Sequence, residues 1–182
     1  MLYLHFLGFP EIRFEDKIID NFISNKVHVL LAYLVLNPNI HSRERLASLL
    51  WEEMPTKRAK ANLRQALHNL QTALPEYITA DRQTVYFISD LPYQCDVELL
   101  QTIDEALGKE EVLTEHLQMA VDLYRGRFLE GIVLNEETEI ADWIYRQQEM
   151  LQVAYIRVLA ELAQRYVQSA EWSKALQCCQ KI

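Results

Sequence analysis

The sequence of 182 residues lacks the features that would place it in a membrane or outside the cell. It has no run of about eighteen or more apolar residues, the length that a transmembrane helix needs. The N-terminus, MLYLHFLGFPEIRF, has neither the basic segment nor the cleavage site of a signal peptide. Glycine and proline are few and no low-complexity tract occurs, which argues against disorder. These absences predict a folded cytoplasmic protein.

Cysteine is scarce, and its placement excludes the sites that cysteines often build. Cys178 and Cys179 are neighbours that cannot easily bridge each other, and Cys95 stands far from both. No Cys-x-x-Cys and no Cys/His ligand spacing occurs, so we expect reduced thiols and neither a metal nor a cofactor. The chain also lacks a glycine-rich phosphate loop and a Ser/His/Asp or Cys/His arrangement, so an enzyme is the least favoured class.

The net charge of −8 is unevenly distributed along the chain. Residues 1–91 contain ten basic and ten acidic side chains, whereas residues 92–182 contain eight basic and sixteen acidic ones. The entire excess of negative charge therefore belongs to the second half. The acidic average does not argue against a nucleic-acid partner for the first half.

The pattern of residues 1–91 predicts strands, three helices and a hairpin. Alternating apolar residues indicate two antiparallel strands near 2–6 and 11–15. A helical stripe begins after Ser24 or Asn25 and ends at Asn37-Pro38, and Ser42 is a candidate N-cap for a second helix. A third helix at 56–74 and a hairpin at 77–88 follow. This order is typical of a winged helix-turn-helix with an extra N-terminal sheet.

Residues 92–182 read as helical throughout, which gives the whole chain an α+β class. Apolar periodicity predicts helices at about 96–107, 110–125, 138–150, 152–168 and 172–181. The last two match the spacing of a tetratricopeptide repeat through Leu159, Leu162, Ala163, Tyr166, Ala175, Cys179 and Ile182. Because the sequence stops inside the second helix of this repeat, we expect this domain to be truncated. The acidic residues Glu136, Glu137, Glu139 and Asp142 suit a helix N-terminal turn better than a metal site.

The third predicted helix carries the strongest functional pattern. No acidic residue lies between Glu53 and Glu76, and Leu63, Leu67, Leu70 and Leu74 form one apolar stripe. Arginine suits guanine and an amide suits adenine in the major groove, so we predict base contacts by Arg58, Asn62 and Gln65. Cations that lie beside them or on neighbouring elements are predicted to contact the DNA backbone: Lys57, Arg64, His68, Arg43, Arg45 and Arg82.

Four motifs in order resemble the DNA-binding half of the antibiotic-regulatory (SARP-type) transcriptional activators: FLGFPEIRF, LLAYLVLNP, HSRERLASLLW and RAKANLRQALHNLQTAL. The segments YQCDVELL, LYRGRFLEG and ADWIYRQQEML resemble the bacterial transcriptional activator domain of that family. The resemblance implies a winged helix-turn-helix at 1–91 and a tetratricopeptide-like helical domain at 92–182. It also implies promoter binding through 56–74 and the wing at 77–88, often by two protomers on direct repeats, and contact with RNA polymerase.

One alternative remains open at this point. The acidic, repeat-like second half also suits a protein-interaction module in which the winged helix no longer binds DNA. If acidic residues from Pro92 onward cover the basic helix, this alternative, or an autoinhibited form of the DNA-binding protein, gains support.

Overall fold

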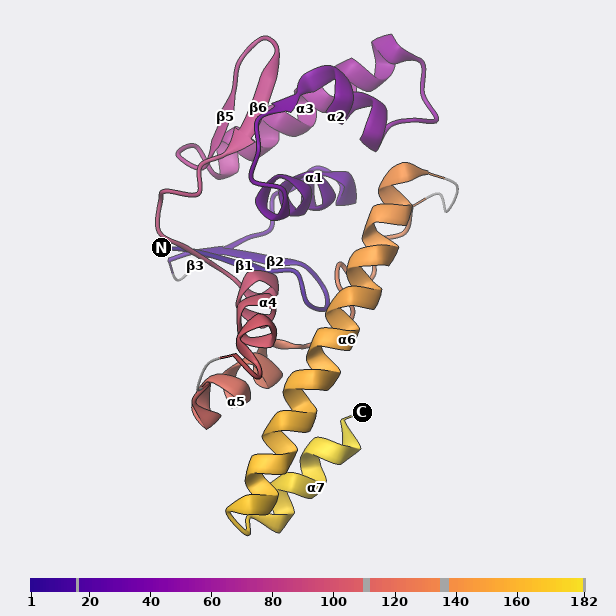
Figure 1. Ribbon diagram of the computed structural model, residues 1–182. Coiled ribbons are helices and arrows are strands. Elements are labelled where there is room, and N and C mark those ends of the chain that lie inside the picture. The colour runs from indigo at the N-terminus through magenta and orange to yellow at the C-terminus, as the bar shows by residue number, and fades with distance from the viewer. Residues whose placement is uncertain (16, 110–111, 135–137, 182) are drawn as a thin grey trace.

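The computed structural model describes residues 1–15, 17–109, 112–134 and 138–181 (Figure 1). Within these ranges the chain forms two small sheets and several helices. The strands are β1 (Leu2–His5), β2 (Glu11–Phe14), β3 (Lys17–Ile19), β4 (His41–Ser42), β5 (Ile78–Ala80), β6 (Thr84–Phe87) and β7 (Tyr93–Cys95). The helices are α1 (Asn25–Leu36), α2 (Arg43–Leu50), α3 (Thr56–Ala73), α4 (Asp96–Ala106), α5 (Thr114–Leu123), α6 (Glu139–Gln168) and α7 (Trp172–Gln180).

The first sheet joins the start of the chain to a strand that follows residue 91. Its order is β3-β2-β1-β7, with β1 antiparallel to β2 and parallel to β7. The two predicted N-terminal strands are confirmed, whereas β7 was not predicted because three residues are too few to show a period. Leu2 of β1 lies opposite Tyr93 of β7. The proposed division after residue 91 thus falls just before a strand of the N-terminal sheet.

The second sheet packs against the first three helices: β4 contacts α2, β5 contacts α3 and β6 contacts α1. Its order is β4-β6-β5, so the short strand before α2 pairs with the second strand of the β5–β6 hairpin. The Ser42 hydroxyl accepts the backbone N–H of Arg45 at 3.5 Å, as expected of the predicted N-cap. This arrangement holds α2, α3 and the hairpin together at one end of the molecule (Figure 1).

The longest helix, α6, corrects the prediction for the second half. Two helices were expected at 138–150 and 152–168, but residues 139–168 form one helix because no glycine or proline interrupts them. The helix expected at 110–125 begins at Thr114. Figure 1 shows α6 running past α1 and the first sheet to α7, and no helix among the described residues is long and apolar enough to cross a bilayer.

The repeat-like end of the chain is buried much as its spacing suggests. Leu159, Leu162, Tyr166 and Ala175 are buried between α6 and α7 or against α5. Cys179 is exposed and its neighbour Cys178 is buried instead. Ile182, Glu136 and Glu137 lie outside the described residues, while Glu139 and Asp142 are in the first turn of α6.

A buried carboxylate fixes α4 to the end of β1. Asp96 accepts the backbone N–H groups of Phe6 and Leu7, each at 2.9 Å, and that of Val97 at 2.8 Å. Burial raises the pKa of Asp96, while the N–H groups of Phe6 and Leu7 and the nearby His5 lower it. A side chain that the sequence did not single out therefore holds the first sheet against the helical half.

Candidate nucleic-acid interface

The buried face of α3 is wider than the leucine stripe that the sequence predicted, because two alanines are buried beside the leucines. The buried positions are Ala59, Leu63, Ala66, Leu67 and Leu70. Both alanines lie on the side of the leucine stripe that also carries Asn62 and Asn69, so the buried face is turned toward those two amides. The middle of the exposed face consequently moves to Lys57, Ala61, Arg64 and His68, all of which are exposed. Lys57 and Arg64 were expected at its flank.

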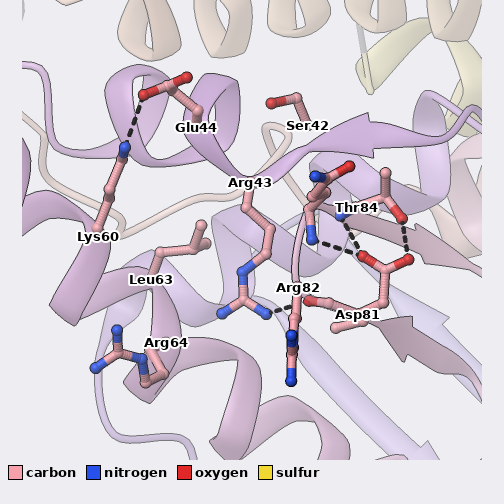
Figure 2. A pocket seen from close by; sticks show the side chains of 11 residues that line it. Ser42, Arg43, Glu44, Lys60, Leu63, Arg64, Asp81, Arg82 and Thr84 are labelled. Carbon is pink, nitrogen blue, oxygen red and sulfur yellow. Dashed lines mark hydrogen bonds and ion pairs between the residues drawn. The ribbon is translucent and has the colours of Figure 1, made fainter.

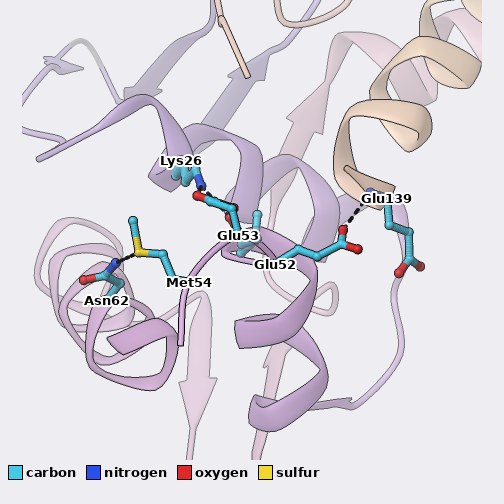
Figure 3. Close-up of polar contacts among 7 residues, drawn as sticks. Lys26, Glu52, Glu53, Met54, Asn62 and Glu139 are labelled. Carbon is cyan, nitrogen blue, oxygen red and sulfur yellow. Dashed lines mark hydrogen bonds and ion pairs between the residues drawn. The ribbon is translucent and has the colours of Figure 1, made fainter. Parts of the chain in front are cut away.

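Two amides of α3 are engaged within the protein. The Asn62 Nδ2 group donates to the Met54 sulfur at 3.1 Å, and the Asn62 side chain is half-buried (Figure 3). Asn69 accepts the Ile23 N–H through Oδ1 and donates to the Asn21 carbonyl through Nδ2, both at 3.1 Å. Asn69 thus fastens the segment before α1 to α3, and Asn62 has one donor fewer to offer to a base. Gln65 is exposed.

Most of the cations that were predicted to contact DNA have no partner among the described residues. Lys57, Arg58, Arg64 and His68 are exposed, and no side-chain hydrogen bond or ion pair joins them to any part of the chain that the structure describes. Lys60, by contrast, donates to Glu44 of α2 at 2.7 Å, and this bond holds the pKa of Glu44 below its ordinary value. The exposed face of α3 is therefore open and positive.

A groove of about 1070 Å³ lies between α2, α3 and the β5–β6 hairpin (Figure 2). Arg43, Lys60, Arg64 and Arg82 line it together with two acidic residues. The Arg43 guanidinium donates to the Asp81 carbonyl at 2.7 Å, so this residue, which was predicted to contact the DNA backbone, also holds the hairpin against α2. Arg82 stands exposed at the hairpin tip, with no side-chain partner in the described ranges.

Asp81 shapes that tip, and it was missing from the predicted site. Its Oδ1 accepts the N–H groups of Gln83 and Thr84 at 2.7 and 2.6 Å, and its Oδ2 accepts the Thr84 hydroxyl at 2.9 Å (Figure 2). These bonds hold the pKa of Asp81 below its ordinary value. The signal was available, because aspartate at the start of a tight turn commonly bonds the backbone two residues on.

Arg45 contacts α6, whereas Arg43 contacts the β5–β6 hairpin. Its guanidinium forms an ion pair with the carboxylate of Glu139, the first residue of α6. The sequence placed both arginines on the DNA backbone, whereas the structure directs Arg43 to the hairpin and Arg45 to α6. The contact with Glu139 was not foreseen, because the two residues lie far apart in the chain.

No protein-family model matches the sequence, and no curated protein matches it by sequence. The fold does match solved structures. One of them, "Mycobacterium tuberculosis EmbR in complex with low affinity phosphopeptide", superposes with a TM-score of 0.64 at 19% sequence identity. The match covers 99% of this chain and 58% of the EmbR chain. The chain therefore shares a fold of small sheets and several helices with EmbR, and it spans little more than half of the EmbR chain.

Proposed function

We propose that this protein is a sequence-specific DNA-binding transcriptional regulator of the SARP type. Residues 1–91 act as a winged helix-turn-helix, with α3 as the recognition helix and β5–β6 as the wing. The sequence motifs and the fold shared with EmbR, a SARP-family regulator, support this proposal. The observation that carries it is the exposed face of α3, on which several cations stand together without acidic partners in the described chain.

The position of each side chain refines the proposed contacts. A recognition helix reads bases mainly with its N-terminal half. Arg58 is exposed in that half and Gln65 is exposed just after it, so both remain candidates for base contacts. Asn62 remains a candidate through its side-chain carbonyl oxygen, which accepts no hydrogen bond from the described residues. Arg64 lies nearer the middle of the exposed face, so we add it to the base-contact candidates. Lys57 and His68 suit phosphates.

The second half supplies the proposed protein contacts. We propose that α4–α7 form a tetratricopeptide-like activator domain that contacts RNA polymerase, and that two protomers bind direct repeats. The protein would act in the cytoplasm, without enzymatic activity and without a cofactor. The acidic excess of residues 92–182 suits a surface that binds protein rather than nucleic acid.

Selection of bound duplexes from a random DNA pool would test the proposal most directly. We expect an enriched sequence motif that is bound, in fluorescence anisotropy, with a steep negative slope of log affinity against log salt. Arg64→Gln should relax specificity at one position and cost about 1–3 kcal/mol of binding free energy. Arg146→Gln is a matched control, because Arg146 is an exposed arginine on α6, remote from α3 in the chain. A pool that shows no enrichment and no salt-dependent binding would overturn the proposal.

The alternative of a protein-interaction module that no longer binds DNA would gain support if acidic residues after Pro92 covered the basic helix. Among the described residues, Glu139 is the only acidic side chain of that half that pairs with a predicted DNA contact, and its partner is Arg45 of α2. Lys57, Arg58 and Arg64 of α3 have no carboxylate partner among the described residues.

A further inference from the structure

Glu139 is tied twice to the segment that precedes α3. Its carboxylate pairs with the Arg45 guanidinium. Its backbone N–H donates to the Glu52 carboxylate at 3.1 Å (Figure 3). Glu52 lies in the turn between α2 and α3. The Glu52 carboxylate accepts the Glu139 N–H, one of the N–H groups that a helix leaves without a partner in its first turn. Its negative charge also suits the positive N-terminal end of α6. We call Arg45, Glu52 and Glu139 the latch.

The elements on both sides of the latch are held by contacts that do not depend on it. On one side, Lys26 of α1 donates to the Leu50 carbonyl at 2.7 Å and pairs with Glu53 at 2.9 Å, which fixes the α2–α3 turn. On the other, the ring of Trp143 in α6 lies 5.1 Å from that of Tyr33 in α1. Loss of the Arg45–Glu139 pair therefore needs only side-chain rotation and leaves α6 in place.

The Arg45–Glu139 pair is easy to exchange for another anion. The two side chains remain 54% and 48% exposed, and ion pairs in water contribute little to stability. A phosphate can accept two parallel hydrogen bonds from an arginine, whereas Glu139 accepts one from Arg45. Arg45 also lies in the first turn of α2, directly after Arg43 and Glu44, which line the groove between α2, α3 and the hairpin.

We propose that the latch regulates DNA binding. While it is closed, Glu139 holds Arg45 away from the DNA backbone. When it opens, Arg45 binds a phosphate and the complex becomes tighter. The inference rests on the proposed DNA-binding function. It gives Glu139, in the first turn of α6, a role in regulating Arg45 of the DNA-binding half.

The test is Glu139→Gln, measured by fluorescence anisotropy on a mixed-sequence duplex of about 30 base pairs, because phosphate contacts do not depend on sequence. We expect binding about two- to fivefold tighter at low salt, which is the scale of one exposed ion pair. The slope of log affinity against log salt should become more negative by roughly one, because one more phosphate is neutralised.

Two further variants assign the gain to Arg45. Adding Arg45→Gln to Glu139→Gln should abolish the gain, so that the double variant binds DNA no more tightly than Arg45→Gln alone. Asp142→Asn is the matched control: it removes the same charge from the same turn of α6, and Asp142 makes no described ion pair with Arg45. Thermal melting by circular dichroism establishes that each variant is folded.

The outcomes separate the latch from the proposed function. Unchanged or weaker binding by Glu139→Gln overturns the latch and leaves DNA binding intact. So does an equal gain from Asp142→Asn, or a gain that persists without Arg45. A wild-type protein that binds no duplex at any salt concentration overturns both.

Discussion

Three of the four lysines and arginines of α3 differ in their partners from those after residue 150. On α3, Lys57, Arg58 and Arg64 are exposed and unpaired within the described chain. Near the C-terminus each cation has a carboxylate: Arg157 pairs with Asp104, Arg165 with Glu161, Lys174 with Glu171 and Lys181 with Asp122. A protein that needed only a folded, dissolved surface would intersperse the two charge signs. The unpaired cations of α3 therefore support the proposed binding of DNA.

The largest expected effect comes from neutralising the unpaired cations. Replacing Lys57, Arg58 and Arg64 together with glutamine should weaken DNA binding by about a hundredfold or more, and reduce the salt slope by roughly three. Anisotropy across a salt series measures both quantities. The matched control replaces Arg157, Arg165 and Lys174 with glutamine, which changes the net charge equally. If the control weakened binding as much, net charge rather than the α3 face would explain the effect.

A second comparison sets the buried face of α3 against its exposed face. Leu63 is 2% exposed, so Leu63→Ala should lower the free energy of unfolding by about 2–5 kcal/mol, since it leaves a cavity. Urea denaturation measures this loss. Ala61→Leu, on the exposed face, should change the unfolding free energy by no more than about 0.5 kcal/mol. It should weaken DNA binding, because the larger side chain keeps α3 out of the DNA major groove. Strong destabilisation by Ala61→Leu would contradict the assigned face.

A smaller effect distinguishes an amide of α3 that is bonded within the protein, Asn69, from one that is exposed, Gln65. Asn69→Ala removes the bonds to the Ile23 N–H and the Asn21 carbonyl, so it should cost about 1–2 kcal/mol of stability. Gln65→Ala should leave stability nearly unchanged and relax the DNA sequence preference. Urea denaturation and binding to the selected motif separate the two roles. A large stability loss from Gln65→Ala would show that its side chain is structural.

The smallest effect concerns the hairpin tip and pH. The pKa of Asp81 is lower in the folded protein than its ordinary value of 3.8, because the N–H groups of Thr84 and Gln83 bind its charged form. The stabilisation is thus fully present above pH 3.8, and it is lost as the pH falls through the lower folded pKa. The Thr84 amide resonance in an NMR titration should report that loss. A midpoint at or above 3.8 would contradict the turn geometry.

The order of elements in residues 1–91 was readable from the sequence because each element carried a strong local signal. Asn37-Pro38 ended α1, Ser42 began α2, and the leucine stripe of α3 gave the helix period. The short strands β3, β4 and β7 and the unbroken α6 were missed. Two or three residues show no period, and the break expected after residue 150 had no glycine or proline to cause it.

The candidate site was predicted in its composition but not in its orientation. The leucines alone set the helical wheel, and small Ala59 and Ala66 gave no sign that they would be buried. Their burial turned Asn62 inward and moved Arg64 toward the middle of the exposed face. Asp81 could have been found from its turn motif. Asp96 could not, because its partners Phe6 and Leu7 are far away in the chain.

The sequence by itself determined most of the helical and extended segments, where the negative charge is concentrated and which helix is basic, because propensity, periodicity and charge are local properties. Only the tertiary structure decided which cations remain free. Lys60 is neutralised by Glu44, Arg43 holds the hairpin, and Arg45 is held by Glu139 from the opposite half of the chain. Those pairings depend on how elements distant in sequence pack together, and no local pattern encodes that arrangement.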